Sequence, residues 1–135
     1  MTSKRTLLET IRDDWGENIQ SHICMEIVDY IFSVPCDQLA YLTYGTFRNV
    51  TQNKYSNQEL LSAIQYLYGD VMKVLEVKFE YIEDGEDYPL DKEELAKAEE
   101  TGYLVHPETG KEIEDFRDKV FIYFDAQNFR QELFI

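Results

Sequence analysis

Apolar residues recur every three or four positions through the first half of the chain, as they do along one face of an α-helix. A first helix is predicted to begin at Thr2 or Ser3, either of which can cap it, and to end at Gly16. A second helix ends before Pro35, because proline cannot continue a helix. The apolar positions are Leu7, Leu8, Ile11 and Trp15 in the first helix and Ile19, Ile23, Ile27, Tyr30, Ile31 and Val34 in the second.

Two further helices are expected in the next thirty or so residues of the chain. Residues 37–42 are predicted to form a short helix capped by Asp37, and residues 45–53 a polar loop. Ser56 and Glu59 have the spacing of a capping box, in which each side chain bonds the other residue's backbone N–H. The helix that they open is predicted to run to residue 68.

Beyond Gly69 the apolar residues alternate with polar ones, which is the period of a strand with one buried face. This predicts a strand over residues 71–82, and a second apolar strand follows at 120–124. The sequence therefore predicts an α+β fold in one domain, residues 1–135, with a helical N-terminal part and a two- to three-stranded antiparallel sheet. In the first strand, Val71, Leu75, Val77, Phe79 and Tyr81 are expected inside, and Glu76, Lys78 and Glu80 outside.

Residues 83–118 form an acidic insert between the two strands. The insert has 14 acidic and 4 basic residues, so it carries −10 of the formal charge of −14, and it looks too polar for a core of its own. Within it a helix is expected over 91–100, stopping at Gly102, followed by a turn at 106–110. The tail, residues 127–135, is expected either to dock on the body or to protrude towards a partner.

The overall charge restricts the partners. With 27 acidic and 13 basic residues, the chain is repelled by nucleic-acid backbones and anionic membranes and attracted to basic proteins. The alternative that acidity only keeps the protein soluble stays open. No secretory signal is recognised at the start and no run of about twenty apolar residues occurs, so a cytoplasmic location is expected, with Cys24 and Cys36 as free thiols.

The order of elements resembles a winged-helix domain whose wing has acquired an acidic insert. Residues 37–42 and 56–68 correspond to the helix-turn-helix, and 71–82 with 120–124 to the wing strands. The insert is similar to small accessory proteins of bacterial conflict and antiphage systems, which implies a role in a bacterial defence or toxin-immunity complex. The segments that carry this likeness are Leu90-Asp91-Lys92-Glu93-Glu94, Thr101-Gly102-Tyr103-Leu104-Val105-His106-Pro107-Glu108-Thr109-Gly110 and Val120-Phe121-Ile122-Tyr123-Phe124.

The segment that corresponds to a recognition helix departs from DNA-binding winged helices. Residues 56–68 contain no Arg or Lys, although such helices use basic side chains on phosphates and bases. Only Arg48 and Lys54 lie nearby in the sequence. A winged helix with this surface suits protein contacts better than DNA contacts.

One tripeptide has the form of a metal-dependent nuclease motif. Glu76-Val77-Lys78 would place a carboxylate for a divalent cation and an amine near the scissile phosphate on one face of a strand, with Asp70 as a further carboxylate. The alternative is the charged solvent face of an ordinary strand. The negative charge of the chain opposes approach of a nucleic-acid substrate, so the second interpretation is favoured.

Two other groups have the chemistry of metal ligands without the spacing. Cys24, Cys36, His22 and His106 are zinc-ligand types, but no paired spacing organises them. Residues 83–87 are acidic but lack the spaced ligands of a calcium loop, so a solvated loop is expected. No catalytic, cofactor-binding or metal-binding residue is therefore predicted, and no cofactor.

The sequence thus favours a non-catalytic, acidic protein-binding accessory or adaptor subunit whose partner has a basic surface. It is expected to contact neither nucleic acid nor membrane directly, and a homodimer is left open. The alternatives are a DNA-mimic inhibitor of a nucleic-acid-binding enzyme and a metal-dependent nuclease using Glu76 and Lys78. The predicted partner-binding residues are the insert's acidic residues and two of its tyrosines: Glu83, Asp84, Glu86, Asp87, Tyr88, Tyr103, Glu112, Glu114 and Asp115.

Overall fold

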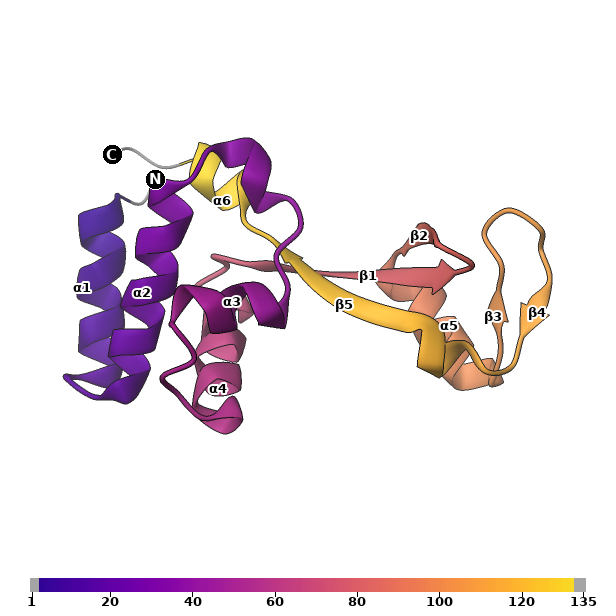
Figure 1. Ribbon diagram of the computed structural model, residues 1–135, viewed down its shortest axis with the longest axis horizontal. Helices are drawn as coiled ribbons and strands as arrows, with labels where there is room; N and C mark the ends of the chain where they lie inside the picture. Colours follow the sequence, from indigo (N-terminus) through magenta and orange to yellow (C-terminus); the bar gives the residue numbers. More distant parts are fainter. Residues whose placement is uncertain (1–2, 133–135) are drawn as a thin grey trace. The chain divides into compact units, whose positions relative to one another are not determined.

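The computed structural model describes residues 3–132, which form a mixed α+β fold, as predicted (Figure 1). The described residues include six α-helices, a three-stranded antiparallel sheet and a two-stranded one. The chain divides into two compact units. The helical unit comprises the chain up to Glu76 and again from Phe124, and the acidic unit is Val77–Tyr123.

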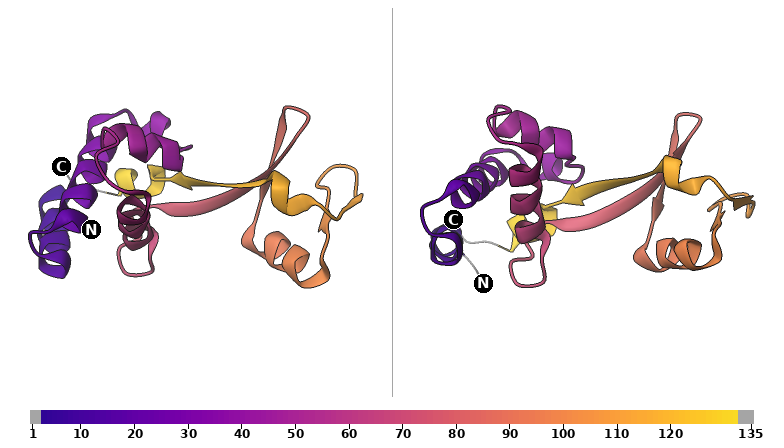
Figure 2. Two further views of the ribbon diagram at one scale, coloured as in Figure 1. Left: turned by 60° about the horizontal axis from the view of Figure 1, so that its bottom comes forward. Right: turned by 90° about the horizontal axis from the view of Figure 1, so that it is seen from below.

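The helical unit is built around α2, which packs against α1, α3 and α4; Figure 2 shows α1 and α2 side by side. Ser3, Asn18 and Ser56 cap α1, α2 and α4 by accepting backbone N–H bonds, and Glu59 completes the capping box at α4. The predicted positions of these three helices are therefore confirmed, but Ile19, which was placed in the apolar stripe of the second helix, is 47% exposed. The unit's helices are α1 (Lys4–Trp15), α2 (Ile19–Ser33), the 3-10 helix η1 (Cys36–Leu39), α3 (Tyr44–Val50), α4 (Asn57–Tyr68) and α6 (Gln127–Gln131).

The segment between α2 and α4 was predicted wrongly. Asp37 caps nothing, because η1 is a single 3-10 turn with Pro35 at its N-cap. The helix lies later, at α3, where a loop was expected, and it starts with a capping box made by Thr43 and Thr46. The element that would be the second helix of a helix-turn-helix is thus one 3-10 turn, and the winged-helix resemblance is not confirmed.

The first strand also begins later than predicted. Val71 is 89% exposed and Lys73 has φ +51°, so the chain turns here instead of extending. The N–H groups of Val74 and Leu75 donate to the carbonyl of Leu67 at the end of α4, at 2.8 and 3.1 Å. Residues 70–75 therefore close the helix end, and β1 starts at Glu76.

The predicted alternation fails at the centre of β1 (Glu76–Glu83), because Glu80 and Tyr81 are both buried, with 3% and 0% of their surface exposed. The strand order is β2-β1-β5, so β1 is the central strand. A central strand has neighbours at both edges, whose side chains can cover a residue on the face that was expected to be open. Glu80 lies opposite Pro89 of β2 (Glu86–Leu90).

The acidic unit contains two hairpins and one helix. Asp84 and Gly85 both have positive φ, 53° and 78°, which fits the two central residues of a type I′ turn between β1 and β2. The helix α5 (Lys92–Thr101) is capped by Asp91 and ends at the left-handed Gly102, as predicted. The remaining elements are β3 (Leu104–Val105) paired with β4 (Glu112–Ile113), the 3-10 helix η2 (Phe116–Lys119) and β5 (Val120–Asp125).

The acidic unit has a hydrophobic core, contrary to the prediction from its polarity. Its apolar residues are few, but the two hairpins, α5, η2 and β5 bring them together from seven elements. Most of the acidic insert therefore belongs to a folded unit, and residues 83–87, expected to be a solvated loop, are the turn and strand ends of the β1–β2 hairpin. The buried core residues are Tyr81, Leu90, Ala98, Leu104 and Phe116, with Phe79, Tyr88, Leu95, Ile113 and Val120 packed against them.

Part of the predicted tail, residues 133–135, lies outside the described residues. The preceding part forms α6, whose Arg130 donates to the carbonyl of Val34 at 3.2 Å. Among residues 3–132, no helix has both the length and the apolar character that a membrane crossing requires.

Candidate functional site

A groove of about 560 Å³ on the acidic unit brings together residues from the β1–β2 turn, the β3–β4 hairpin and η2. We call it the acidic groove. Five of the nine predicted partner-binding residues line it, all of them carboxylates. Its lining residues are Glu83, Asp84, His106, Thr109, Lys111, Glu112, Ile113, Glu114, Asp115 and Lys119.

Glu83 is the most tightly held carboxylate of the groove. It accepts hydrogen bonds from the Tyr81 hydroxyl at 2.7 Å and from Lys119 Nζ at 3.0 Å. Both bonds favour the ionised carboxylate, so the hydrogen bond from Tyr81 and that from Lys119 lower the pKa of Glu83. Lys119 also lies 3.9 Å from Asp115. Glu83 therefore anchors the groove wall, whereas Asp84, Glu112 and Glu114 are exposed.

His106 organises the hairpin that forms the other wall. Its Nδ1 accepts the backbone N–H groups of Glu108 and Thr109, at 3.1 and 3.2 Å. Its ring meets the rings of Tyr88 and Tyr81 edge-on, with centroids 4.7 and 5.7 Å apart. His106 thus connects the β3–β4 turn to the β1–β2 hairpin, and these contacts give its ring a structural role in the turn.

Four predicted residues lie outside the groove. Glu86 and Tyr88 bond each other on β2, where the tyrosine hydroxyl donates to Glu86 at 2.5 Å, and Asp87 is exposed beside them. Tyr103 lines a separate hollow of about 310 Å³ between α5 and β3, together with Leu104 and Val105. The structure therefore separates the predicted surface into the groove, β2 and the Tyr103 hollow.

Four further residues of the groove, and the structural role of His106, were not predicted from the sequence. They are Thr109, Lys111, Ile113 and Lys119. The available signals were the dipeptides Asp84-Gly85 and Thr109-Gly110, each flanked by residues that can form strands. Two hairpins predicted from them would have placed residue 83 and residue 112 next to hairpin loops, but not beside each other, because the hairpins belong to separate sheets. Lys119 had no such signal, because its contact with Glu83 spans 36 positions of the chain.

Two tyrosines of the acidic unit, the buried Tyr81 and the partly buried Tyr88, give a prediction at alkaline pH. Burial and then the hydrogen bond to Glu83 raise the pKa of Tyr81 to about 12; the hydrogen bond to Glu86 and then burial raise that of Tyr88 to about 12. The unfolded chain loses these protons first, at its ordinary pKa of 10.0. Their contribution to the free energy of unfolding is therefore complete below pH 10.0 and lost as the pH rises towards about 12.

Phenolate absorbance during an alkaline titration measures the pH at which these tyrosines ionise in the folded protein. We expect a late phase near pH 12, which the substitution Tyr88→Phe reduces by one tyrosine. If every tyrosine of the folded protein ionised in one step near pH 10.0, the contacts of Tyr81 and Tyr88 described above would be wrong.

Side chains of metal-ligand types occur in the sequence, but no metal-binding residue was predicted from them. Within residues 3–132, no three His, Cys, Asp or Glu side chains are arranged to hold a metal ion. Glu76 accepts a hydrogen bond from Asn128 Nδ2 at 2.6 Å. Cys24 is fully buried, which raises the pKa of its thiol to about 12, and it forms no disulfide with Cys36.

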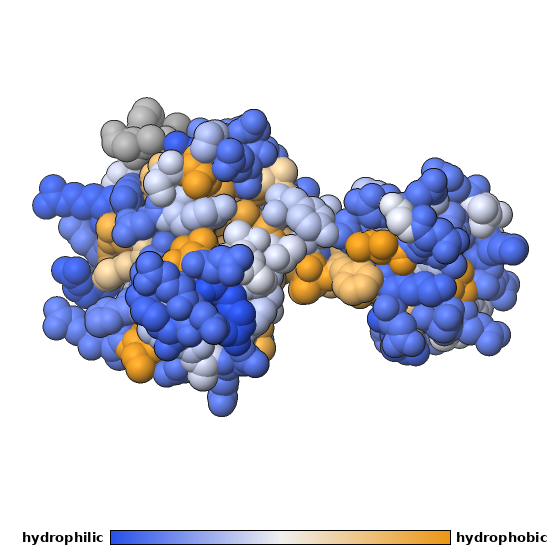
Figure 3. All heavy atoms as spheres, viewed as in Figure 1, coloured by the Kyte–Doolittle hydropathy of each residue, from blue (hydrophilic) through white to orange (hydrophobic). Residues whose placement is uncertain are grey.

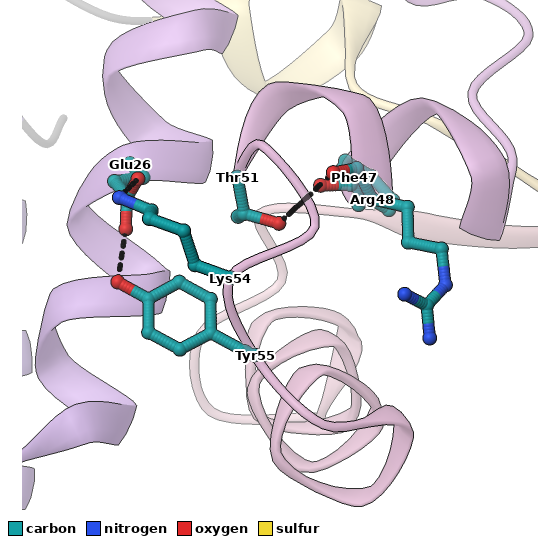
Figure 4. A network of polar contacts seen from close by, with 6 residues as sticks. All are labelled: Glu26, Phe47, Arg48, Thr51, Lys54 and Tyr55. Carbon is teal, nitrogen blue, oxygen red and sulfur yellow. Dashed lines mark hydrogen bonds and ion pairs between the residues drawn. The ribbon is translucent and has the colours of Figure 1, made fainter.

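A polar network in the helical unit has a structural role (Figure 4). Glu26 on α2 accepts from Lys54 Nζ at 2.7 Å and from the Tyr55 hydroxyl at 2.5 Å. Thr51 Oγ1 donates to the carbonyl of Phe47 at 2.9 Å. Both carboxylate oxygens of Glu26 are engaged, so the network fastens the α3–α4 loop to α2.

Family models, curated protein sequences and solved structures were compared with the chain, and none matches it. The candidate surface is therefore defined by the charges and contacts of its own residues.

Proposed function

We propose that the protein is a non-catalytic accessory subunit whose acidic unit binds a basic surface of a partner protein. The observation that carries this proposal is the distribution of charge over the two units. The acidic unit, Val77–Tyr123, has 15 acidic and 6 basic residues and so a formal charge of −9. About two thirds of the net charge thus lies on about one third of the chain.

The folding of the acidic unit supports a role for this charge in recognition. A charged segment that serves solubility alone needs no hydrophobic core. The carboxylates of the acidic unit are instead attached to two hairpins that pack on a shared hydrophobic core. Fixed charges lose little conformational freedom on binding, so more of their attraction contributes to affinity. Asp84, Glu112 and Glu114 are exposed on the acidic groove and are the residues through which a basic side chain would be bound.

A DNA-mimic inhibitor is the same proposal with a narrower partner, in which the carboxylates occupy the phosphate-binding groove of a nucleic-acid enzyme. Competition with duplex DNA for the isolated partner distinguishes the two. The bacterial defence setting and the nuclease alternative stay predictions from the sequence.

Affinity capture with the full chain tests the proposed function. We compare the wild type with a variant that neutralises four groove carboxylates: Asp84→Asn, Glu112→Gln, Glu114→Gln and Asp115→Asn. Each exposed charge pair contributes up to about 1 kcal/mol, so the partner's affinity should fall about 10- to 100-fold. Wild-type binding should also weaken steeply as salt shortens the Debye length.

A matched control neutralises four exposed carboxylates of the helical unit: Asp13→Asn, Glu17→Gln, Asp37→Asn and Asp70→Asn. It changes the net charge by the same amount, so the position of the charge is the only difference. Equal losses in the two variants, or a partner whose affinity does not depend on salt, would contradict the proposed function.

A further inference from the structure

β5 forms one edge of the three-stranded sheet, since the strand order is β2-β1-β5. Near the end of β5, the N–H of Phe124 donates to the carbonyl of Leu42 at 2.7 Å, and the N–H of Leu42 donates to the carbonyl of Phe124 at 2.8 Å. These groups therefore point away from β1. Backbone direction alternates along a strand, so the N–H and C=O of Ile122 and Val120 point to the same outer edge, and those of Phe121 and Tyr123 point to β1.

The outer edge of β5 lacks the features that normally prevent a strand from pairing with another chain. The opposite edge strand, β2, has Glu86, Asp87 and Pro89, which are residue types that discourage such pairing. β5 reads Val-Phe-Ile-Tyr-Phe before Asp125, without proline or charge, and Phe121 and Ile122 are 47% and 49% exposed. In the described chain, no strand lies beyond this edge next to Val120 and Ile122.

Exposed apolar side chains accompany this edge on an otherwise polar unit. Figure 3 shows the visible face of the acidic unit covered mostly by hydrophilic residues, with apolar ones gathered at the strands. Phe121 and Ile122 point to opposite faces of the sheet, so an added strand would cover one apolar residue on each face.

The charge of the acidic unit decides between the candidate occupants of this edge. A second copy of the chain would bring another unit of formal charge −9 against the first, and the two would repel each other. A basic chain is attracted by the same carboxylates. Asp118, which is exposed, precedes the strand by two residues, and the exposed carboxylates of the acidic groove lie on the same unit.

We propose that β5 binds an extended segment of a basic protein as an added strand, paired through the backbones of Val120 and Ile122. This inference rests on the proposed function and names the way in which the partner is recognised. Main-chain hydrogen bonds provide affinity in this mode, and alternate side chains of the added strand provide specificity. The segment should be apolar at alternate positions and carry Lys or Arg at its ends.

The test uses the full chain, labelled with ¹⁵N, and a synthetic capped peptide, Lys-Arg-Val-Thr-Val-Thr-Val-Arg-Lys. A control peptide replaces the central Val by Pro, which keeps the charge but removes the central N–H. We expect saturable binding of the first peptide and a slowing of amide exchange at Val120 and Ile122 by at least about tenfold. The control peptide should bind at least about tenfold more weakly.

The variant Ile122→Pro provides the reciprocal test. Its missing N–H points away from β1, so the sheet should stay intact while peptide binding is lost. The control peptide tests the same bond on the wild-type protein if this variant does not fold. Sedimentation of the wild type, without peptide, should show a monomer.

Three results would overturn the inference. In the first, both peptides bind equally, with changes in amide chemical shift confined to the acidic groove. That result would agree with the proposed function and contradict binding by an added strand. Absence of binding by either peptide would also remove it, and the proposed function would then be judged by the capture experiment alone. A wild-type dimer abolished by Ile122→Pro would assign the edge to a second copy.

Discussion

Replacing Phe116 with Ala is expected to unfold the acidic unit while the helical unit stays folded. Phe116 is fully buried and is one of five residues at the centre of the acidic unit's core. Truncating a buried Phe to Ala costs about 3–5 kcal/mol. The unit has only 47 residues, and a core of that size rarely supplies more than about 3–5 kcal/mol in total. The substitution should therefore remove most or all of its stability.

Amide hydrogen exchange measured by mass spectrometry resolves the two units. In the Phe116→Ala variant, peptides from 77–123 should exchange rapidly and peptides from α1, α2 and α4 should keep their protection. Phe116→Leu is the matched control, because it stays apolar at similar volume and should cost less than about 1.5 kcal/mol. Loss of protection in both units at once would show that they unfold as one cooperative unit.

Replacing Phe47 with Ala is expected to destabilise the helical unit by about 3–5 kcal/mol. Phe47 is the only buried residue of α3, a helix of seven residues. Its ring centroid lies 5.9 Å from that of Phe124, and its carbonyl accepts the bond from Thr51. A helix this short is not stable alone, so its order depends on this side chain.

Urea unfolding followed by far-UV circular dichroism gives the free energy for this variant. Phe47→Leu is the control and should lose less than about 1.5 kcal/mol. Amides of α3 and of the loop held by Tyr55 should lose protection first in Phe47→Ala, before those of α2. A loss below about 1 kcal/mol would mean that α3 is held by other contacts.

The capped helices were predictable because their signals are local. Ser56 and Glu59 lie three positions apart and satisfy each other's backbone groups, so the start of α4 needs no other part of the chain. The same holds for Asp91 and Gly102 at the ends of α5. Thr43 and Thr46 form an equally local pair, but threonine is a weak helix former, and Phe47 only holds α3 once it packs beside Phe124.

The start of β1 was predicted wrongly because the alternation of apolar and polar residues does not reveal how the end of the preceding helix satisfies its carbonyl groups. Val71 continues the apolar pattern, but the carbonyl of Leu67 recruits the N–H groups of Val74 and Leu75 and turns the chain. The same alternation assigned Glu80 to the solvent face. Glu80 is buried instead, because β1 is the central strand of the sheet and has a neighbouring strand on each side. These errors share one cause. Each outcome depends on backbone groups or strands that lie outside the short stretch of sequence from which the alternation was read.

The sequence by itself determined the fold class, the main helices and the concentration of negative charge between residues 83 and 118, because propensity, capping and charge are properties of neighbouring residues. Only the tertiary structure decided that this acidic segment has a core. Tyr81 and Phe116 lie 35 positions apart and become neighbours only when both hairpins have formed. The open edge of β5 was likewise decided by strand order, since an edge exists only relative to the strands beside it.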